Sequence, residues 1–265
     1  MQDTISLTQM LKNSSLNELF QQTLERVKNN PEDLKIRDVL FKLYCVDGVW
    51  DKALLQLQTM ALMDEELKKQ TELYKNLVFS EMQRAQVLAG ERQAATLDGT
   101  FPHWMEVLHQ ANVLQYQGKG DQAEEQRGEA FNLAECASGC SDTLGQFEWI
   151  ADSDGRLGPV CEFICAGGYR WVAFSDIQSL EVSAPQGLLD LLWAPATLKS
   201  GDNTWYGFVP ARYPISAEDD QTIKLGSKTE WASISDMLSQ GSGRKVLVTD
   251  MSEHSILEVG NITFG

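Results

Sequence analysis

The first half of the chain carries apolar residues at every third or fourth position, the spacing that places side chains on one face of a helix. Stop and start signals separate these stripes: a capping-box pattern at 15–18 precedes the first, and Asn30-Pro31 ends it. The pattern predicts six helices, at about residues 16–29, 36–48, 50–61, 66–90 and 102–114, with a last one capped by Asp121 and having Glu124 at the reciprocal position. The first half is therefore predicted to be all helical.

Two of the predicted helix-helix turns share a signature. They read Gly48-Val49-Trp50-Asp51-Lys52-Ala53 and Gly118-Lys119-Gly120-Asp121-Gln122-Ala123, so the second lacks the aromatic residue of the first. The two alanines are 70 positions apart, about two periods of the ~34-residue tetratricopeptide repeat, in which a small residue lets two helices approach. The signature predicts a repeat-like helical array. Such arrays curve, and their concave side accepts an amphipathic helix or an extended peptide.

The apolar pattern changes to alternation and short runs after about residue 144, which predicts strands. Residues 160–165 and 169–174 form a predicted hairpin, and 204–209, 245–250 and 255–259 are further predicted strands. Residues 188–193 fit either a short helix or the beginning of a strand. The predicted fold class is α+β with two domains: a helical, repeat-like, protein-binding domain at 1–140, and a β-rich α+β domain of unknown role at 141–265.

Charge narrows the set of partners. The chain has 22 basic and 38 acidic residues, a net charge of −16, and residues 1–146 and 147–265 each carry −8. An evenly acidic surface repels phosphate backbones and anionic membrane surfaces, so neither nucleic acid nor membrane is an expected partner. Residues 1–5 have no secretory pattern, and no apolar run approaches the ~20 residues of a membrane span. The expected location is the cytoplasm.

The spacing of cysteine, histidine and acidic residues gives little indication of a metal site anywhere in the chain. Among the five cysteines, Cys136 and Cys140 lie four apart, as do Cys161 and Cys165, and neither pair is a Cys-x-x-Cys with a neighbouring His. The acidic run 218–220 lacks the Gly and the spaced carboxylates of a calcium loop. The interpretation is free or buried thiols and a solvated loop, with no metal site.

Catalytic and nucleotide-binding motifs are equally weak. Gly118-Lys119-Gly120 lacks the length and the Lys-Ser/Thr of a phosphate loop. His254 has Ser252 and Glu253 as neighbours but no Gly-x-Ser-x-Gly turn, and His103 and His109 are six apart, on different helix faces. The sequence therefore predicts no catalytic residues and no cofactor, and a protein that is not an enzyme.

A family resemblance adds to this interpretation. It rests on a helical front half with Leu43-x-Cys45-x-x-Gly48-x-Trp50, followed in order by Val160-Cys161-Glu162, Tyr169-x-Trp171, Trp193-Ala194-Pro195-Ala196, Pro210-Ala211-Arg212-Tyr213-Pro214, Thr229-Glu230-Trp231, Gly243-Arg244 and Thr249-Asp250. The chain resembles the ImpE/SciE/TagJ family of accessory proteins of bacterial type VI secretion systems. The resemblance implies binding to a helix at the N-terminus of the small contractile-sheath subunit and, indirectly, a link to the ClpV disassembly ATPase.

Three residues are candidates for protein binding. Arg212 lies between two prolines that fix the backbone and could aim its guanidinium outward, although a buried Arg212 paired with Glu230 or an aromatic face is the alternative. Trp193 and Trp231 are the other two candidates, and the alternative for both is a packing role in the core of the β-rich domain.

Two rival functions stay open at this point. One is an enzymatic or ligand-binding C-terminal domain, which predicts a polar pocket that gathers Arg212, Glu230 and Asp250. The other is a structural protein that acts through homo-oligomerisation.

Overall fold

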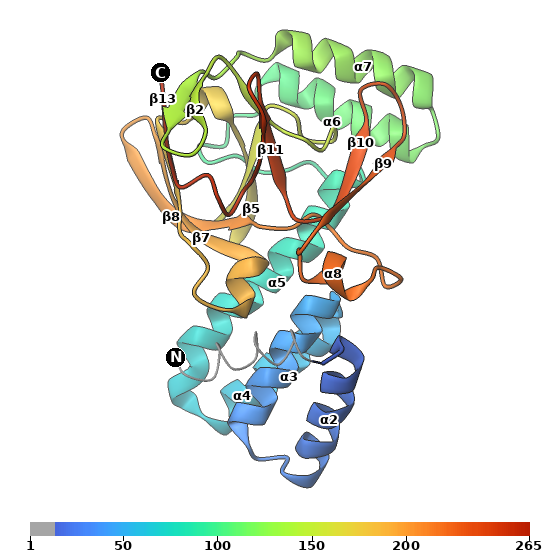
Figure 1. Cartoon of the computed structure of the whole chain (residues 1–265), viewed down its shortest axis with the longest axis vertical. Coiled ribbons are helices and arrows are strands. Elements are labelled where there is room, and N and C mark those ends of the chain that lie inside the picture. Colours follow the sequence, from blue (N-terminus) through green and yellow to red (C-terminus); the bar gives the residue numbers. More distant parts are fainter. Residues whose placement is uncertain (1–13) are drawn as a thin grey trace.

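The computed structural model describes residues 14–265, and elements carry the labels of Figure 1. Four helices stack at one end, a β-rich part forms the other, and a further helical hairpin covers that part (Figure 1). The α-helices are α2 (Leu16–Asn29), α3 (Leu34–Asp47), α4 (Trp50–Met63), α5 (Lys68–Leu88), α6 (His103–Tyr116), α7 (Gly120–Leu133) and α8 (Gln221–Lys224), with 3-10 turns η1 (Glu65–Leu67), η2 (Phe174–Asp176) and η3 (Leu188–Leu191). An α+β class is confirmed.

Three sheets make up the β-rich part. An eight-stranded sheet has the order β2-β1-β13-β6-β7-β8-β4-β5, and two smaller sheets have the orders β10-β9 and β12-β11-β3. The strands are β1 (Gly139–Ser141), β2 (Gly145–Phe147), β3 (Ile150–Asp152), β4 (Val160–Cys165), β5 (Gly168–Ala173), β6 (Ser179–Val182), β7 (Trp193–Ser200), β8 (Asn203–Pro210), β9 (Thr229–Ser233), β10 (Ser239–Gly243), β11 (Val246–Thr249), β12 (Glu253–Ser255) and β13 (Asn261–Phe264). The last strand, β13, pairs with β1 on one side and with β6 on the other, so the end of the chain lies inside the large sheet.

The two predicted helix-helix turns have the same hydrogen bonds, 70 positions apart. The N–H of Val49 donates to the carbonyl of Tyr44, and that of Lys119 donates to Leu114, both at 2.9 Å. Gly48 and Gly118 adopt φ of 73° and 74°, a left-handed conformation that glycine adopts without steric cost. Both hairpins therefore end their first helix in a Schellman motif, as the shared signature predicts.

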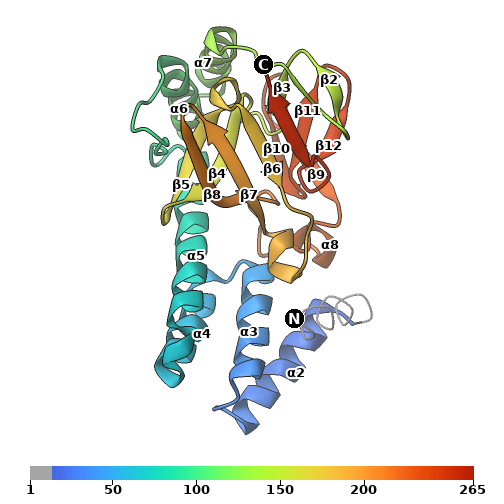
Figure 2. The same ribbon diagram turned by 90° about the vertical axis from the view of Figure 1, so that its left-hand side faces the viewer.

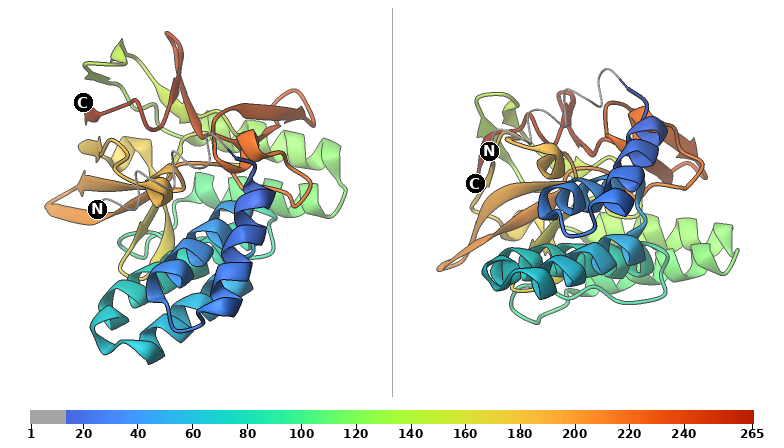
Figure 3. Two further views of the ribbon diagram at one scale, coloured as in Figure 1. Left: turned by 60° about the horizontal axis from the view of Figure 1, so that its bottom comes forward. Right: turned by 90° about the horizontal axis from the view of Figure 1, so that it is seen from below.

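A continuous repeat array is not confirmed. α2 to α5 pack consecutively, each on the next, and Figure 3 shows them side by side from below. α6 and α7 pack on each other at the opposite end of the molecule, above the β-rich part (Figure 1). The chain from 89 to 102 crosses between the two groups, and Ala95 bridges to Arg170 at the edge of β5. The curved groove expected of a repeat array is thus limited to α2–α5.

Two local predictions need correction. Asp121 and Glu124 do not form a helix cap: α7 begins at Gly120 without a side-chain cap, and Glu124 instead bonds the β9–β10 turn. The predicted strand at 255–259 is wrong, because β12 ends at Ser255 and a turn follows. Residues 188–193 contain both predicted alternatives, since η3 ends at Leu191 and β7 begins at Trp193.

Strand β4 lies between two hydrophobic cores, which explains why all six of its residues are buried. Val160 and Ile164 belong to a core shared with the helices, whereas Phe163 and both cysteines of the strand belong to a second core within the β-rich part. Helix α5 runs from the helical stack onto the sheet at β5 (Figure 2). The first core therefore crosses the predicted boundary at residue 140.

The shared core bears on the division into 1–140 and 141–265, which stays a prediction. We expect residues 1–140 alone to give a helical circular dichroism spectrum, because α2–α5 pack consecutively on one another and Phe41 of α3 contacts Tyr74 of α5. The fragment lacks the partners of Arg84 and Phe101, which are Glu162 and Trp171 of the β-rich part. Since 1 kcal/mol shifts Tm by about 2–4 °C for a chain of this length, we expect the loss of these contacts to give the fragment a Tm at least ~10 °C below that of the whole chain. An equal Tm would contradict this expectation.

Candidate protein-binding surface

A groove crosses the outer face of α3 between α2 and the α4–α5 junction. Its volume is about 530 Å³, and we call it the α3 groove. Its apolar lining consists of Leu19 from α2, Leu34, Ile36 and Val39 from α3, Met60 from α4 and Leu67 from η1. Leu34, Val39 and Leu67 are only half-buried, so apolar surface is accessible in the groove. A groove lined by aliphatic side chains from several helices suits the apolar face of another helix.

Local sequence sets the position of α3. Asp33 caps the helix, and its carboxylate accepts hydrogen bonds from the backbone N–H groups of Lys35 (2.9 Å) and Ile36 (3.2 Å). Gly48 ends the helix in its left-handed conformation. The capping box predicted for α2 is present, with Glu18 N to Ser15 Oγ at 3.2 Å and Ser15 N to Glu18 Oε2 at 3.1 Å. Local sequence therefore fixes where α2 begins and where α3 begins and ends, and these two helices carry part of the groove lining.

The charges around the α3 groove nearly cancel. Three basic and three acidic side chains line it: Arg26, Lys35, Lys42, Asp33, Asp38 and Asp64. Lys42 and Asp38 form an ion pair at 2.5 Å. Residues 16–88 carry 10 basic and 12 acidic residues, whereas residues 89–146 carry 3 and 9. Most of the negative charge of the first half thus lies outside the helices that form the groove.

Arg212, the first predicted candidate, is buried where the β-rich part meets α3. Its guanidinium donates to the carbonyls of Cys45 and Val46, both at 2.7 Å, and to that of Lys224. Burial lowers the pKa of Arg212 to about 10, so it remains charged at neutral pH. Glu230 lies elsewhere, exposed and paired with Lys228 at 2.7 Å. Arg212 therefore binds the C-terminal end of α3 rather than either partner expected for a buried arginine.

The two tryptophan candidates differ in exposure. Trp193 is buried at the beginning of β7, where its indole N–H donates to Glu81 (2.9 Å) and its ring lies 6.1 Å from that of Trp50. Trp231 in β9 is 39 % exposed and meets Tyr213 edge to face at 5.4 Å. Of the three predicted residues, only Trp231 presents surface to a partner, and their role in protein binding stays a prediction.

A buried ionic cluster joins α5 to the β-rich part. Arg84 binds Glu162 through two hydrogen bonds, at 2.6 and 2.8 Å, and the second oxygen of Glu162 lies 2.6 Å from Lys245. Lys245 also pairs with Asp152, which accepts the Tyr213 hydroxyl at 2.8 Å. Because these groups satisfy one another in the interior, the cluster is a connection between elements, and the sequence did not predict it.

The polar pocket expected of the enzymatic alternative is not formed from the predicted residues. Arg212 is buried, Glu230 is exposed, and exposed Asp250 accepts the backbone N–H of Glu148 at 2.9 Å. Cys161 and Cys165 are buried free thiols, and Cys136 and Cys140 are exposed free thiols. Among residues 14–265, no three His, Cys, Asp or Glu side chains are close enough together to bind a metal ion. Within the same residues, no helix has both the length and the apolar character needed to cross a membrane.

The fold and the groove define a two-part α+β protein whose helical end carries an apolar groove. Residues 145–263 match the family model described as ImpE protein. The chain is 34% identical over 263 residues to the type VI secretion system accessory component TagJ of Pseudomonas aeruginosa, covering 97% of this chain and 90% of that protein. The chain therefore belongs to the ImpE family, and TagJ is one of its relatives.

A solved structure shows the same fold. The crystal structure of protein VPA1032 from Vibrio parahaemolyticus superposes with a TM-score of 0.88 at 23% identity, covering 98% of this chain and 97% of that one. The likeness extends over both the helical and the β-rich part.

Proposed function

We propose that this protein is a non-enzymatic accessory component of a bacterial type VI secretion system that binds a helix of the small contractile-sheath subunit in the α3 groove. Its relative TagJ is a type VI secretion system accessory component. The observation that carries the proposal is the accessible aliphatic lining of the groove, contributed by α2, α3, α4 and η1. The protein would act in the cytoplasm and reach the ClpV ATPase only indirectly, through the sheath subunit.

The charges that line the groove change the ligand expected from the sequence. From the sequence alone, the net charge of −8 in the first half predicts a ligand with basic residues beside its apolar anchors, whose binding weakens with salt. Three cations and three anions line the α3 groove itself, so rim charge cancels there. We therefore expect a ligand helix with apolar anchors at i, i+3/i+4 and i+7, and only a mild effect of salt, about threefold between 50 and 500 mM.

The test is a titration of a labelled peptide from the N-terminus of the small sheath subunit. The Leu34→Glu/Leu67→Glu variant places two carboxylates in the groove, and both positions are half-buried and outside the core cluster, so folding should be retained. We expect its Kd to rise at least tenfold, about 1.4 kcal/mol. Leu62→Glu is the matched control, because Leu62 is 87 % exposed on α4 and does not line the groove.

Equal binding by the groove variant and the parent would refute the α3 groove as the site. Equal weakening by Leu62→Glu would show that the peptide responds to any carboxylate added to the helical end. Each variant is compared by its melting curve first, so that a loss of binding is not a loss of folding.

A further inference from the structure

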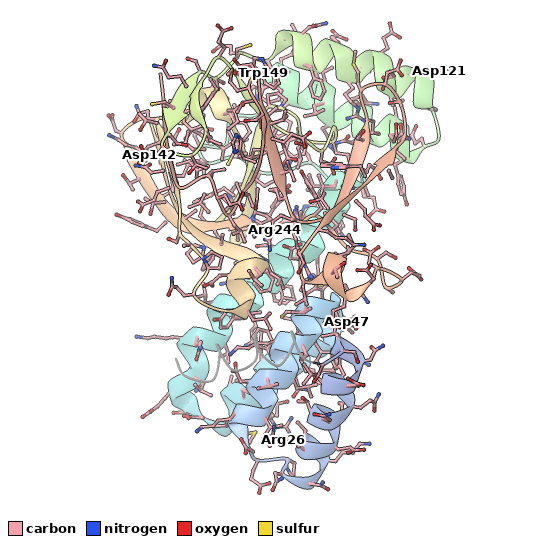
Figure 4. All side chains as sticks on the ribbon, in the orientation of Figure 1. Arg26, Asp47, Asp121, Asp142, Trp149 and Arg244 are labelled. Atoms are coloured by element: carbon pink, nitrogen blue, oxygen red, sulfur yellow. The ribbon has the colours of Figure 1, made fainter. Side chains whose placement is uncertain are left out.

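A second hollow lies at the other end of the molecule, between α7, β3 and the β9–β10 turn. Its volume is about 340 Å³, and we call it the Trp149 hollow. The apolar lining comes from Phe131 of α7, Ala134 directly after that helix, Trp149 before β3, Val248 of β11 and Met237 of the turn. Figure 4 shows Trp149 beside α7, far from Arg26 at the α3 groove. The two hollows could therefore be occupied at the same time.

The lining has the residue types of a binding site. Trp149 and Met237 both line the hollow, and they are 38 % and 47 % exposed. Both side chains are therefore accessible to a ligand. Tryptophan dominates binding energy at protein interfaces, and methionine adapts its shape to different apolar ligands. The hollow is suited to one large apolar side chain.

The turn that carries Met237 is fixed onto α7. Glu124 accepts the backbone N–H of Met237 at 2.7 Å and the hydroxyl of Ser235. Gly128 lets the methionine approach, since a Cβ there would lie 3.3 Å from its sulfur. The hollow is thus formed before any ligand arrives, which reduces the entropy lost on binding.

The surroundings of the hollow are acidic. Glu135 lines it, Glu148 directly precedes Trp149 and Asp236 directly precedes Met237, and all three residues are exposed. Within the described part of the chain, none of these three carboxylates forms an ion pair. Residues 89–146 contain nine acidic and three basic residues, and one of the three, Arg127, is fully buried. This charge favours a cationic ligand beside the apolar hollow.

We propose that the Trp149 hollow and the exposed carboxylates beside it form a docking surface for a basic peptide segment with a single large apolar anchor. The anchor occupies the hollow, and flanking Lys or Arg residues lie against Glu135, Glu148 and Asp236. This surface is separate from the α3 groove and takes a ligand of different chemistry, so the protein can hold two partners at its two ends.

The probe is a short labelled peptide of Lys and Ser with one central Phe, titrated into the full-length protein by fluorescence anisotropy. Two companion peptides replace Phe with Ser or Lys with Glu. The Glu135→Lys/Glu148→Lys variant tests the charge, and both positions are exposed, so the fold is retained. Trp149→Ala tests the anchor. Glu25→Lys/Glu66→Lys, at exposed positions of the helical end, gives the same change in charge as a control.

We expect at least a tenfold weaker Kd for each companion peptide, for Glu135→Lys/Glu148→Lys and for Trp149→Ala, with the control variant within twofold of the parent. The proposal is overturned if the probe does not bind at low salt, if the Ser companion binds as well as the Phe peptide, or if the control variant weakens binding as much as Glu135→Lys/Glu148→Lys. Glu135→Lys/Glu148→Lys should leave binding of the sheath peptide unchanged, which separates a failure here from a failure of the α3 groove.

Discussion

Glu162→Gln is expected to lower the free energy of unfolding by about 3–5 kcal/mol, the usual result of removing one partner from a buried ionic cluster. Glu162 accepts two hydrogen bonds from Arg84, one from the Tyr169 hydroxyl (2.5 Å), and a contact from Lys245. A neutral amide leaves two buried cations with only Asp152 and Glu81 close by. At this chain length the loss corresponds to a Tm lower by roughly 6–20 °C.

Thermal melting of matched variants tests this expectation. Glu230→Gln is the control, because Glu230 is an exposed glutamate whose pair with Lys228 should contribute less than about 1 kcal/mol. The double variant Arg84→Met/Glu162→Met should recover much of the loss, since replacing both partners by apolar side chains leaves neither charge unpaired. A Tm of Glu162→Gln equal to the parent would show that the cluster is not a stabilising connection.

The pH dependence of stability follows from the same glutamate. Burial by itself would raise the pKa of Glu162, but Arg84 and Lys245 hold it well below its usual range. A lowered folded-state pKa stabilises the protein above the unfolded pKa of about 4.3, and this stability is lost as pH falls further toward the folded value. Denaturant midpoints measured from pH 6 down to pH 2.5 should therefore fall steeply for the parent below about pH 4.5. Glu162→Gln should lose less over this interval.

The parts of the fold that depend on local sequence could be predicted. Helix stripes, the Schellman turns at Gly48 and Gly118, and the β4–β5 hairpin all arise from residues within a few positions of one another. The placement of α6–α7 could not be predicted, because the same turn signature fits a stacked repeat and a separate hairpin. The insertion of β13 between β1 and β6 is also set by pairings between distant segments.

In the candidate sites, too, local sequence predicts some features, whereas contacts between distant segments determine the others. The buried cluster was not predicted: the position of Glu162 within an apolar strand is a local sign of a buried charge, but its partner Arg84 is 78 positions away. The α3 groove combines residues of α2, α3, α4 and η1 that look like ordinary core positions in their own stripes. The two prolines beside Arg212 distinguish it in the sequence, whereas its contacts with the backbone of α3 depend on the docking of the two parts.

Arg212→Ala is expected to destabilise the protein by about 3 kcal/mol or more. The guanidinium satisfies backbone carbonyls of Cys45, Val46 and Lys224 in the interior, and each buried carbonyl left without a donor costs about 1–3 kcal/mol. Two of these carbonyls belong to the last turn of α3, where a cation also interacts favourably with the helix dipole. Arg212→Lys should recover only part of the loss, because an ammonium group lacks the planar fork that reaches several carbonyls.

Thermal melting and amide hydrogen exchange together test the role of Arg212. We expect a Tm lower by roughly 6–12 °C and faster exchange in α3, with α7 less affected. Arg92→Ala, at an exposed position, is the control and should leave both unchanged. Because α3 forms the floor of the groove, binding of the sheath peptide should weaken only in proportion to the loss of folded protein. A variant that melts like the parent but no longer binds the peptide would contradict the structural role and assign Arg212 to partner recognition, as the sequence predicted.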